Sequence, residues 1–340
     1  MLPRLHEQYP LLGLNSFGVE ARARWFCRVR GAEDLAALAA DPRLTGLPRL
    51  VIGGGSNLLL TRDFDGLVIK VEIAGLQELG DADDAWHLEI GAGENWHETV
   101  ERLVTMGRPG LENLALIPGS CGAAPVQNIG AYGLELAQRF DSLTAWDFAS
   151  QRLVQMSAAE CAFGYRDSLF KHTLADRRLI LSVRLALPKR WRPVEGYADL
   201  ARELKERNIT RPDARAIFDA VVAIRRRKLP DPAVIGNAGS FFKNPVVSDE
   251  THQALIARYP SLVGYPQPGG RVKLAAGWLI DAVGLKGATR GRAGVYEKQA
   301  LVLVNRGGAT GAEILAMAQE IQEKVAETFG VWLQPEPVIL

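Results

Sequence analysis

One serine lies in a glycine-rich stretch, residues 236–245, which reads Gly-Asn-Ala-Gly-Ser-Phe-Phe-Lys-Asn-Pro. Glycines let a backbone approach a ligand closely and adopt positive φ without penalty. Ser240 can therefore be aimed at a bound molecule, with two phenylalanines to exclude water and Lys243 to attract an anionic group. The alternative is a glycine-rich turn whose serine bonds its own backbone.

Two further glycine-rich segments, which begin at Gly53 and Gly91, invite comparison with the dinucleotide-binding fingerprint. Both fail it, because Leu58 and Trp96 stand where the third glycine belongs. The first segment also runs into strand-like sequence and not into a helix that could hold a pyrophosphate at its N-terminus. Successive glycine amides can still hold a pyrophosphate without a helix, so we expect a phosphate site of this kind.

A third uncharged segment covers residues 117–133 and reads Ile-Pro-Gly-Ser-Cys-Gly-Ala-Ala-Pro-Val-Gln-Asn-Ile-Gly-Ala-Tyr-Gly. Long loops of this kind are uncommon inside compact domains and are usually functional or disordered. The apolar residues throughout argue against disorder. This loop is therefore a candidate binding element.

The composition excludes several classes of protein. The chain of 340 residues is long enough for two or three domains. Its 47% hydrophobic and 23% charged residues suit a globular protein, and a net charge of +1 gives no sign of nucleic-acid or anionic-membrane binding. Any phosphate site must therefore be local.

The cysteines and histidines favour a reducing compartment and no metal. Three widely spaced cysteines form no CxxC pair, and five histidines show no HExxH or paired spacing. The N-terminus lacks the apolar run of a signal peptide, and no apolar stretch reaches the roughly 18 residues of a membrane span. We expect a cytoplasmic protein without a metal centre.

The hydrophobic pattern predicts an α+β fold. Expected strands cover residues 15–30, 50–52, 58–60, 67–73, 86–90, 179–187 and 301–304, with a hairpin over 143–156. Expected helices cover residues 32–40, 95–106, 212–227, 251–258, 275–283 and 311–329, and a Gly/Pro turn covers 264–270. The last helix carries a capping box, Thr310 with Glu313, and a C-cap at Gly330.

Four motifs together resemble one family. The segments 53–57, 117–133, 163–168 (Phe-Gly-Tyr-Arg-Asp-Ser) and 236–245 are similar, in order, to those of the MurB family of UDP-N-acetylenolpyruvoylglucosamine reductases. The resemblance extends from Asn15 to Glu336. It implies a p-cresol-methylhydroxylase-type FAD-binding fold with a C-terminal α/β substrate-binding domain. The implied domains are two FAD-binding subdomains (1–75 and 76–228), a substrate-binding domain (229–325) and a tail packed at the active site (326–340).

The resemblance assigns FAD to the first glycine-rich segment, to the 117–133 loop and to one arginine of the basic run at 225–228. The implied FAD contacts are Gly53, Gly54, Gly55, Ser56, Asn57, Leu58, Pro118, Gly119, Ser120, Gly122, Ala123, Gln127, Asn128, Gly130, Ala131, Tyr132 and Arg225. Neither loop contains a histidine that could bind flavin covalently, so non-covalent binding is expected. Cys121, inside the loop, is read as small filler and not as a redox group.

The reaction implied by the resemblance is the NADPH-dependent reduction of the enolpyruvyl ether of UDP-N-acetylglucosamine to UDP-N-acetylmuramate. Hydride from the reduced flavin reaches C3 of the substrate, and an acid must then protonate C2. Ser240 matches the proton donor of the family, Glu336 the residue that assists it, and Arg166 the arginine that polarises the substrate carboxylate. Arg166 could instead form a surface ion pair with Asp167, and Glu336 could be a solvated tail residue.

The remaining implied contacts are with the nucleotide sugar. The longer form of the family, which closes an extra loop over the substrate through a tyrosine, resembles this chain at residues 196–200 and 264–267. The implied substrate contacts are Tyr197, Lys228, Asn244, Tyr265, Lys273 and Gln299. Structural alternatives are a turn tyrosine at 265, ordinary solvation of Lys273 and Gln299, and a basic helix end that complements the helix dipole at 225–228.

Two other functions compete with this interpretation. A flavin oxidase on the same fold would not need a lysine, an asparagine and tyrosines that grip a nucleotide. A non-catalytic nucleotide-sugar sensor would not need Ser240, Arg166 and Glu336 together. We expect a monomeric enzyme that binds NADPH and the enolpyruvyl UDP-sugar.

Overall fold

The computed structural model describes residues 3–81, 84–174 and 176–340. The chain divides into two compact units. Unit 1 comprises the described residues before Pro10 together with Ala23–Gly55 and Phe64–Arg227. Unit 2 comprises Pro10–Arg22, Ser56–Asp63 and Lys228–Leu340. Each unit is therefore assembled from segments that lie far apart in the sequence.

The first sheet has the order β1-β2-β5-β3, with β1 at His6–Pro10, β2 at Arg22–Val29, β5 at Phe64–Val71 and β3 at Arg49–Ile52. Both β2 and β3 pair with β5 in parallel. Helix α1 (Ala32–Ala39) follows β2 and is confirmed in type and position. The strand expected over 15–30 exists but begins only at Arg22.

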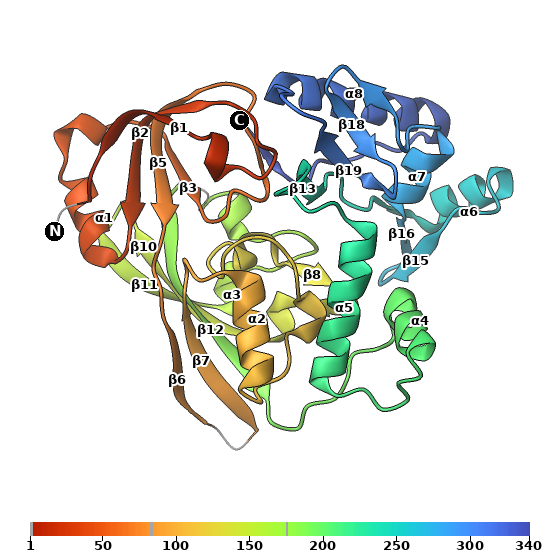
Figure 1. Cartoon of the computed structure of the whole chain (residues 1–340), viewed down its shortest axis with the longest axis horizontal. Helices are drawn as coiled ribbons and strands as arrows, with labels where there is room; N and C mark the ends of the chain where they lie inside the picture. Colours follow the sequence, from red (N-terminus) through yellow and green to blue (C-terminus); the bar gives the residue numbers. More distant parts are fainter. Residues whose placement is uncertain (1–2, 82–83, 175) are drawn as a thin grey trace. The chain divides into compact units, whose positions relative to one another are not determined.

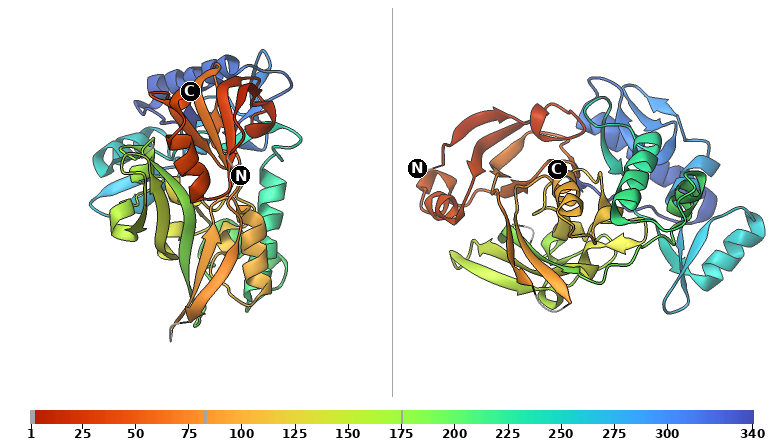
Figure 2. Two further views of the ribbon diagram at one scale, coloured as in Figure 1. Left: turned by 90° about the vertical axis from the view of Figure 1, so that its left-hand side faces the viewer. Right: turned by 60° about the horizontal axis from the view of Figure 1, so that its bottom comes forward.

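The second sheet of unit 1 is antiparallel, in the order β11-β10-β12-β7-β6. Its strands are β6 (Leu76–Asp81), β7 (Ala85–Gly91), β10 (Phe140–Asp147), β11 (Arg152–Ser157) and β12 (Arg178–Pro188). The predicted hairpin is confirmed, since Leu143 faces Met156 across β10 and β11. Figures 1 and 2 show β6 and β7 side by side, with β6 at the edge of this sheet.

The helices of unit 1 lie beside these sheets. They are α2 (Trp96–Thr105), α3 (Ala158–Cys161), α4 (Ala198–Glu206) and α5 (Ala214–Lys228). Asn95 caps α2, which was expected over residues 95–106, by accepting from the Glu98 amide (3.1 Å). Arg215 of α5 donates to the hydroxyl of Thr105 at the end of α2 (2.8 Å), so these two helices are neighbours (Figure 1). The sequence did not predict α4.

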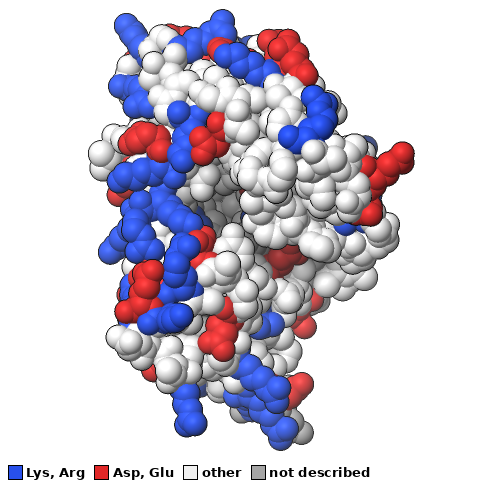
Figure 3. All heavy atoms as spheres, turned by 90° about the vertical axis from the view of Figure 1, so that its right-hand side faces the viewer, with Lys and Arg blue, Asp and Glu red and all other residues white. Residues whose placement is uncertain are grey.

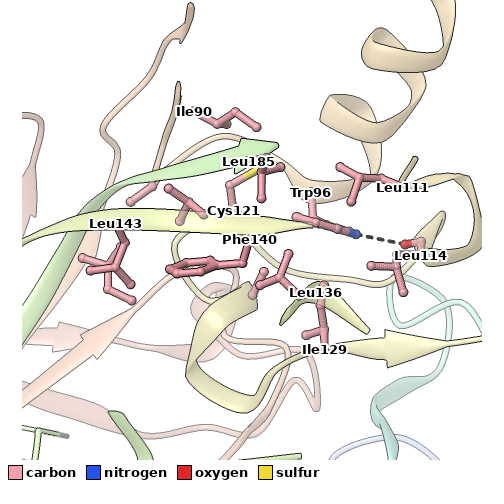
Figure 4. Close-up of a cluster of buried hydrophobic side chains, with 14 of the residues drawn as sticks. Ile90, Trp96, Leu111, Leu114, Cys121, Ile129, Leu136, Phe140, Leu143 and Leu185 are labelled. Atoms are coloured by element: carbon pink, nitrogen blue, oxygen red, sulfur yellow. Dashed lines mark hydrogen bonds between the residues drawn. The ribbon is translucent and has the colours of Figure 1, made fainter. Parts of the chain in front are cut away.

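Trp96 lies at the centre of the unit 1 core. Its indole is fully buried, and Nε1 donates to the carbonyl of Leu114 (2.9 Å). Figure 4 shows it among Leu111, Cys121 and other buried apolar side chains. A buried indole without this acceptor would be destabilised, so the bond fixes the chain after residue 110 against α2.

Unit 2 contains two antiparallel sheets and three α-helices. The sheet orders are β13-β19-β18-β17 and β14-β16-β15. The strands are β13 (Gly236–Ser240), β14 (Val246–Ser248), β15 (Gly264–Gln267), β16 (Arg271–Leu274), β17 (Thr289–Arg290), β18 (Ala293–Tyr296) and β19 (Gln299–Asn305), and the helices are α6 (Asp249–Arg258), α7 (Ala276–Ala282) and α8 (Gly311–Phe329).

Residues 236–240 form a strand, because Gly236 and Asn237 pair with Asn305 and Val304 of β19, so the glycine-rich turn given as the alternative is excluded. One expectation for unit 2 was wrong. Residues 264–267, expected in a turn, form the strand β15. Pro266 is tolerated there because β15 is an edge strand of its sheet.

The predicted boundaries of α8 are confirmed. Thr310 and Glu313 form the capping box, and Gly330 ends the helix at φ 68°. A Cβ on Gly311 would overlap the carbonyl of Leu60, so the helix begins against the segment after β4 (Leu58–Leu59). The C-terminal tail is packed as expected, since β20 (Val338–Ile339) pairs with β4 and buried Gln322 donates to Leu333 O (2.7 Å).

The remaining elements are short. They are the 3₁₀ helices η1 (Leu12–Leu14), η2 (Pro42–Leu44), η3 (Glu112–Leu114), η4 (Ala124–Gln127), η5 (Leu136–Gln138) and η6 (Leu169–Lys171), and the two-residue strands β8 (Gly130–Ala131) and β9 (Leu134–Glu135).

On the face shown in Figure 3, Lys and Arg side chains gather along one side with Asp and Glu among them, and much of the remaining surface is uncharged. No helix within the described residues combines the length and apolar character needed to cross a bilayer. Those same residues contain no group of three His, Cys, Asp or Glu side chains arranged to hold a metal ion.

The buried cysteines generate the first prediction. Burial raises the pKa of Cys27, Cys121 and Cys161 to about 12. Thiol reagents attack the thiolate, so none of the three should react in native protein at pH 8, whereas all three should react in denaturant. Titration with a chromogenic disulfide measures this directly. One rapid equivalent in the native protein would contradict it.

Candidate flavin and substrate sites

The first glycine-rich segment of unit 1 packs backbone to backbone against the 117–133 loop. A Cβ on Gly54 would lie 3.1 Å from Cα of Gly119, and one on Gly53 would overlap the Ser120 hydroxyl. Gly55 has a φ of 63°, which only glycine adopts readily. The glycines therefore permit an approach that side chains would block.

The same loop is anchored on the second glycine-rich segment. The amides of Cys121 and Gly122 donate to the carbonyls of Glu94 and Ala92 (both 2.9 Å). The amide of Trp96 donates to Gly119 O (3.1 Å). Backbone hydrogen bonds thus hold residues 119–122 in place. Their position does not depend on contacts of the loop's exposed side chains.

Left-handed backbone conformations concentrate around this loop. Among the described residues, eight other than glycine have positive φ, and four of them are Leu116, Asn128, Tyr132 and Arg166. Such conformations cost about 1–3 kcal/mol each and persist where the surrounding structure holds them. Their clustering marks the loop and the Arg166 motif as a functional region.

Asn128 connects the loop to the 163–168 motif. Its amide nitrogen donates to Glu135 Oε2 (2.9 Å) and to Gly164 O (3.0 Å), and its oxygen accepts from the Ala137 amide (2.9 Å). The Ser168 hydroxyl adds a bond to Val126 O (2.6 Å). The Asn128 side chain is thus engaged by protein groups, and a contact with FAD at this position would come from its backbone.

Arg166 points back onto the loop. Its Nη2 donates to Gly130 O (2.5 Å), and a Cβ on Gly130 would lie 3.0 Å from Nη1. The carboxylate of Asp167 is instead bonded to His172 (2.8 Å). The structure therefore orients the two charged groups of this Arg-Asp dipeptide toward different partners.

Arg225 is the inward-facing member of the basic run. Its Nε donates to Leu116 O (3.2 Å), and its guanidinium bonds the phenol of Tyr132. Burial lowers the pKa of Arg225 and raises the pKa of Tyr132. The Tyr132 ring contacts that of Tyr197 edge to face, with centroids 5.3 Å apart.

The other members of the run point elsewhere. Arg227 pairs with the buried carboxylate of Glu203 on α4 (2.7 Å), while Arg226 is exposed. Lys228 is the last residue of α5. Within the described residues, Arg225 is the arginine of the run that bonds Leu116 O, directly before the 117–133 loop, and Tyr132 in that loop.

The remaining residues that were predicted to contact FAD lie in these same segments. Pro118, Ala123, Gln127 and Ala131 belong to the 117–133 loop, of which Gln127 ends η4 and Ala131 ends β8. Ser56, Asn57 and Leu58 continue the first glycine-rich segment into unit 2.

In unit 2, Ser240 ends β13 at an irregularity of the sheet. It pairs with Val302, and the register shifts between Asn237 and Ser240. The Asn237 side chain holds this bulge by donating to Ile235 O (2.8 Å) and accepting from the Gly239 amide (2.9 Å). Bulges of this kind redirect a side chain and often lie next to active sites.

The C-terminal tail runs beside the residues that follow Ser240. Phe242 bridges to Pro335, and the Glu336 amide donates to Phe241 O (2.8 Å). Asn57 donates from its side chain to Glu336 O (3.3 Å). The structure thus brings Ser240, Glu336 and Asn57 into one region of unit 2, although 279 positions separate the last two.

Asn244 and Gln299 meet at the start of α7. Oδ1 of Asn244 accepts from the Ala276 amide (2.9 Å). A Cβ on Gly277 would lie 3.2 Å from Oε1 of Gln299. The side-chain oxygen of Asn244 therefore stabilises the start of α7. The amide nitrogen of Asn244 takes no part in this bond and is the group that can donate to a ligand.

Tyr265 and Lys273 are directly opposite each other on β15 and β16. Directly opposed residues of an antiparallel pair project from the same face. Tyr265 is 44% exposed, so this edge offers an aromatic ring and a cation side by side.

Three positioning residues were missed by the sequence analysis. Asn113 is completely buried and donates to Tyr132 O (2.9 Å) and Val194 O (2.7 Å). His97 accepts the Leu116 amide at Nδ1 (3.1 Å), and Asn237 holds the bulge. Asn237 lies between Gly236 and Gly239, and this position in a glycine-rich segment was a signal that the sequence analysis could have used. The partners of His97 and Asn113 are defined only by the fold.

Comparison with known proteins identifies the family. Residues 231–340 match the family described as UDP-N-acetylenolpyruvoylglucosamine reductase, C-terminal domain, and residues 23–157 match an FAD binding domain. A protein of that reductase name from Ralstonia nicotianae is 58% identical over 340 residues, which cover 99% of each chain. The chain belongs to the UDP-N-acetylenolpyruvoylglucosamine reductase (MurB) family.

Other relatives agree. A reductase of the same name from Burkholderia ambifaria is 59% identical over 333 residues, or 97% of this chain and 95% of that protein. The crystal structure of the MurB enzyme from Thermus caldophilus has a TM-score of 0.70 at 24% identity and covers 99% of both chains. The predicted family, the α+β flavin-binding fold and the oxidoreductase class are confirmed.

The residues of this MurB-family enzyme fit FAD. Ser120 Oγ is buried and has no hydrogen-bond partner among the described residues. An unpaired buried hydroxyl destabilises the folded protein unless a ligand supplies the missing partner. Ser120 Oγ lies against the glycine segment where a Cβ on Gly53 would intrude. Glycine amides, a hydroxyl and Arg225 together suit an anionic diphosphate.

His97 generates a prediction of pH dependence. Burial lowers its pKa; Glu98 and Glu101 oppose this shift, and Arg225 and Arg226 add to it. Because the unfolded histidine takes up a proton more readily, its contribution to stability is present above the usual pKa of about 6.5 and is lost as the pH falls through the lower folded value.

We therefore expect the free energy of unfolding to fall more steeply below about pH 6.5 in the wild type than in His97→Asn. Asparagine keeps an acceptor near the position of Nδ1 and does not titrate. Urea unfolding at several pH values measures both slopes. Parallel slopes would show that His97 does not contribute to the pH dependence.

Proposed function

We propose that the enzyme uses NADPH and non-covalently bound FAD to reduce the enolpyruvyl ether of UDP-N-acetylglucosamine to UDP-N-acetylmuramate. The product is a precursor of peptidoglycan. The observation that carries the proposal is Ser240, held on a bulge beside the tail that carries Glu336, in a chain with full-length similarity to reductases of this name.

The flavin contacts are assigned to residues 53–58, to the 117–133 loop and to Arg225. Residues 1–75 and 76–228 act as the two FAD-binding subdomains, residues 229–325 bind the substrate, and residues 326–340 bring Glu336 to Ser240. Bound FAD supplies a hydride carrier between NADPH and the enolpyruvyl group. Gly54, Ser120 and Arg225 hold its diphosphate, and backbone groups of residues 117–133 position the ring.

Ser240 donates the proton to C2 of the enolpyruvyl group. A hydroxyl is a weak acid in water, but the carbon becomes strongly basic when hydride arrives at C3, so a positioned hydroxyl is sufficient. The buried rings of Phe241 and Phe242 follow it directly and exclude water. Glu336 assists, since its backbone is fixed against Phe241 O.

Arg166 binds the carboxylate of the substrate. A guanidinium keeps its charge and can bind a carboxylate with two parallel bonds. The bond to Gly130 O and the left-handed backbone support this role, because they fix the arginine at the loop that positions the flavin.

The proposed nucleotide and sugar contacts come from several segments of the chain. Tyr197 is half-exposed at the start of α4, and Tyr265 with Lys273 forms the exposed edge of β15 and β16. An aromatic ring and a lysine suit a uridine diphosphate. Lys228, Asn244 and Gln299 contact the sugar. We infer a cytoplasmic, monomeric enzyme.

An anaerobic absorbance experiment tests the proposal. We expect the flavin band to bleach when NADPH is added and to recover when the enolpyruvyl UDP-sugar follows. Recovery reports hydride transfer to that acceptor. Bleaching without recovery would reject this substrate and favour an oxidase, for which oxygen alone restores the band.

Ser240→Ala separates the two halves of the reaction. Flavin reduction by NADPH should stay nearly normal, whereas reoxidation by the substrate should slow by more than the ~10²–10⁴-fold typical of general acid catalysis, since no other group is positioned to protonate C2. Stopped-flow absorbance measures both steps. Ser261→Ala, an exposed serine of the same unit, is the matched control. Equal slowing of both steps would make the serine structural.

A further inference from the structure

We propose that Lys70 is a positioning residue for FAD, which orients the glycine loop and supplies positive charge for the flavin diphosphate. Lys70 lies on β5 directly opposite Ile52, the residue before the glycine segment. Its Nζ donates to the carbonyl oxygen of Gly53. No role for this lysine follows from the motifs that define the family.

The bond to Gly53 fixes the direction of one peptide group. In a trans peptide the carbonyl and the following N–H point in opposite directions. By drawing the Gly53 carbonyl toward β5, Lys70 turns the N–H of Gly54 to the opposite side. Gly54 is exposed, and its Cα faces the backbone of Gly119, so this N–H lies at the junction of the two glycine-rich segments.

The charge of Lys70 is not neutralised by the protein. Within the described residues, no carboxylate lies within ion-pair distance of its Nζ. The nearest acid, Glu72, is paired with Arg28 and with Arg30 (3.2 Å). A half-buried ammonium with a neutral carbonyl as its partner is costly, and a bound anion offsets that cost.

Burial supports this electrostatic interpretation. Desolvation lowers the pKa of Lys70; Glu72 opposes the shift and Arg28 adds to it. A diphosphate near the glycine loop would favour the charged form. Lys70 would then resemble Arg225 in function, although it approaches the loop from the sheet and not from a helix.

FAD affinity of the full chain tests the proposal. Lys70→Gln keeps a donor and removes the charge, Lys70→Arg keeps the charge, and exposed Lys205→Gln is the charge-matched control. We expect Lys70→Gln to bind FAD about tenfold more weakly at low salt, with the difference shrinking at high salt. Lys70→Arg and Lys205→Gln should bind like the wild type. Fluorescence of released FAD measures these affinities.

The stability of the FAD-free protein distinguishes this role from a structural one. Without FAD, Lys70→Gln should be at least as stable as the wild type, because a partly buried charge has been removed. Wild-type FAD affinity in Lys70→Gln would overturn the proposal. Parallel losses of stability and affinity, independent of salt, would overturn it as well. Lys70→Met gives the same comparison if the glutamine variant does not fold.

Discussion

Close approach of glycine backbones is the constraint on which the proposed flavin site depends. A Cβ on Gly54 would lie 3.1 Å from Cα of Gly119, and one on Gly53 would overlap the Ser120 hydroxyl. Peptide groups brought this close can present amides to a ligand without any helix N-terminus, which explains why the chain lacks the dinucleotide fingerprint. The binding element is therefore shaped by backbone atoms, and the side chains around it mainly hold those atoms in place.

The proposed catalytic region of unit 2 depends on a different feature. Ser240 pairs with Val302 directly after a bulge in β13, and the Asn237 side chain bonds the backbone groups of Ile235 and Gly239 at that bulge. The tail is then fixed by hydrogen bonds to Phe241 and Asn57. A weak acid such as a hydroxyl can donate a proton efficiently only if its position is well defined. Main-chain hydrogen bonds fix the backbone of this region.

Much of the fold could be predicted because local signals were strong. The capping box at Thr310 and the hairpin over residues 143–156 are each decided by neighbouring residues, and both are confirmed. Residues 264–267 were placed in a turn, and 236–240 were left with a turn as the alternative, because glycine and proline obscure strand character. Their pairing partners lie on β19 and β16, so only the tertiary structure decides their conformation.

The sequence predicted which residues belong to the candidate site, but it did not predict which groups their side chains contact. Motif resemblance named Asn128 and Asn244, yet the structure shows both side chains bonded to the protein itself. Lys70, Asn113 and His97 carry no motif, and each acts on a backbone group of a binding loop. Sequence motifs therefore identify the residues expected to touch ligands. They identify less readily the residues that hold the binding loops in position.

The basic run at the end of α5 shows how helix geometry separates functions among adjacent residues. Consecutive helical residues point about 100° apart, so neighbouring arginines cannot share a partner. Arg225 turns inward to Leu116 O and Tyr132, whereas Arg227 turns to Glu203 on α4. The helix dipole favours cations at this end in general. It does not explain why Arg225 is desolvated beside the 117–133 loop, and that burial is the observation on which we base its proposed contact with the diphosphate.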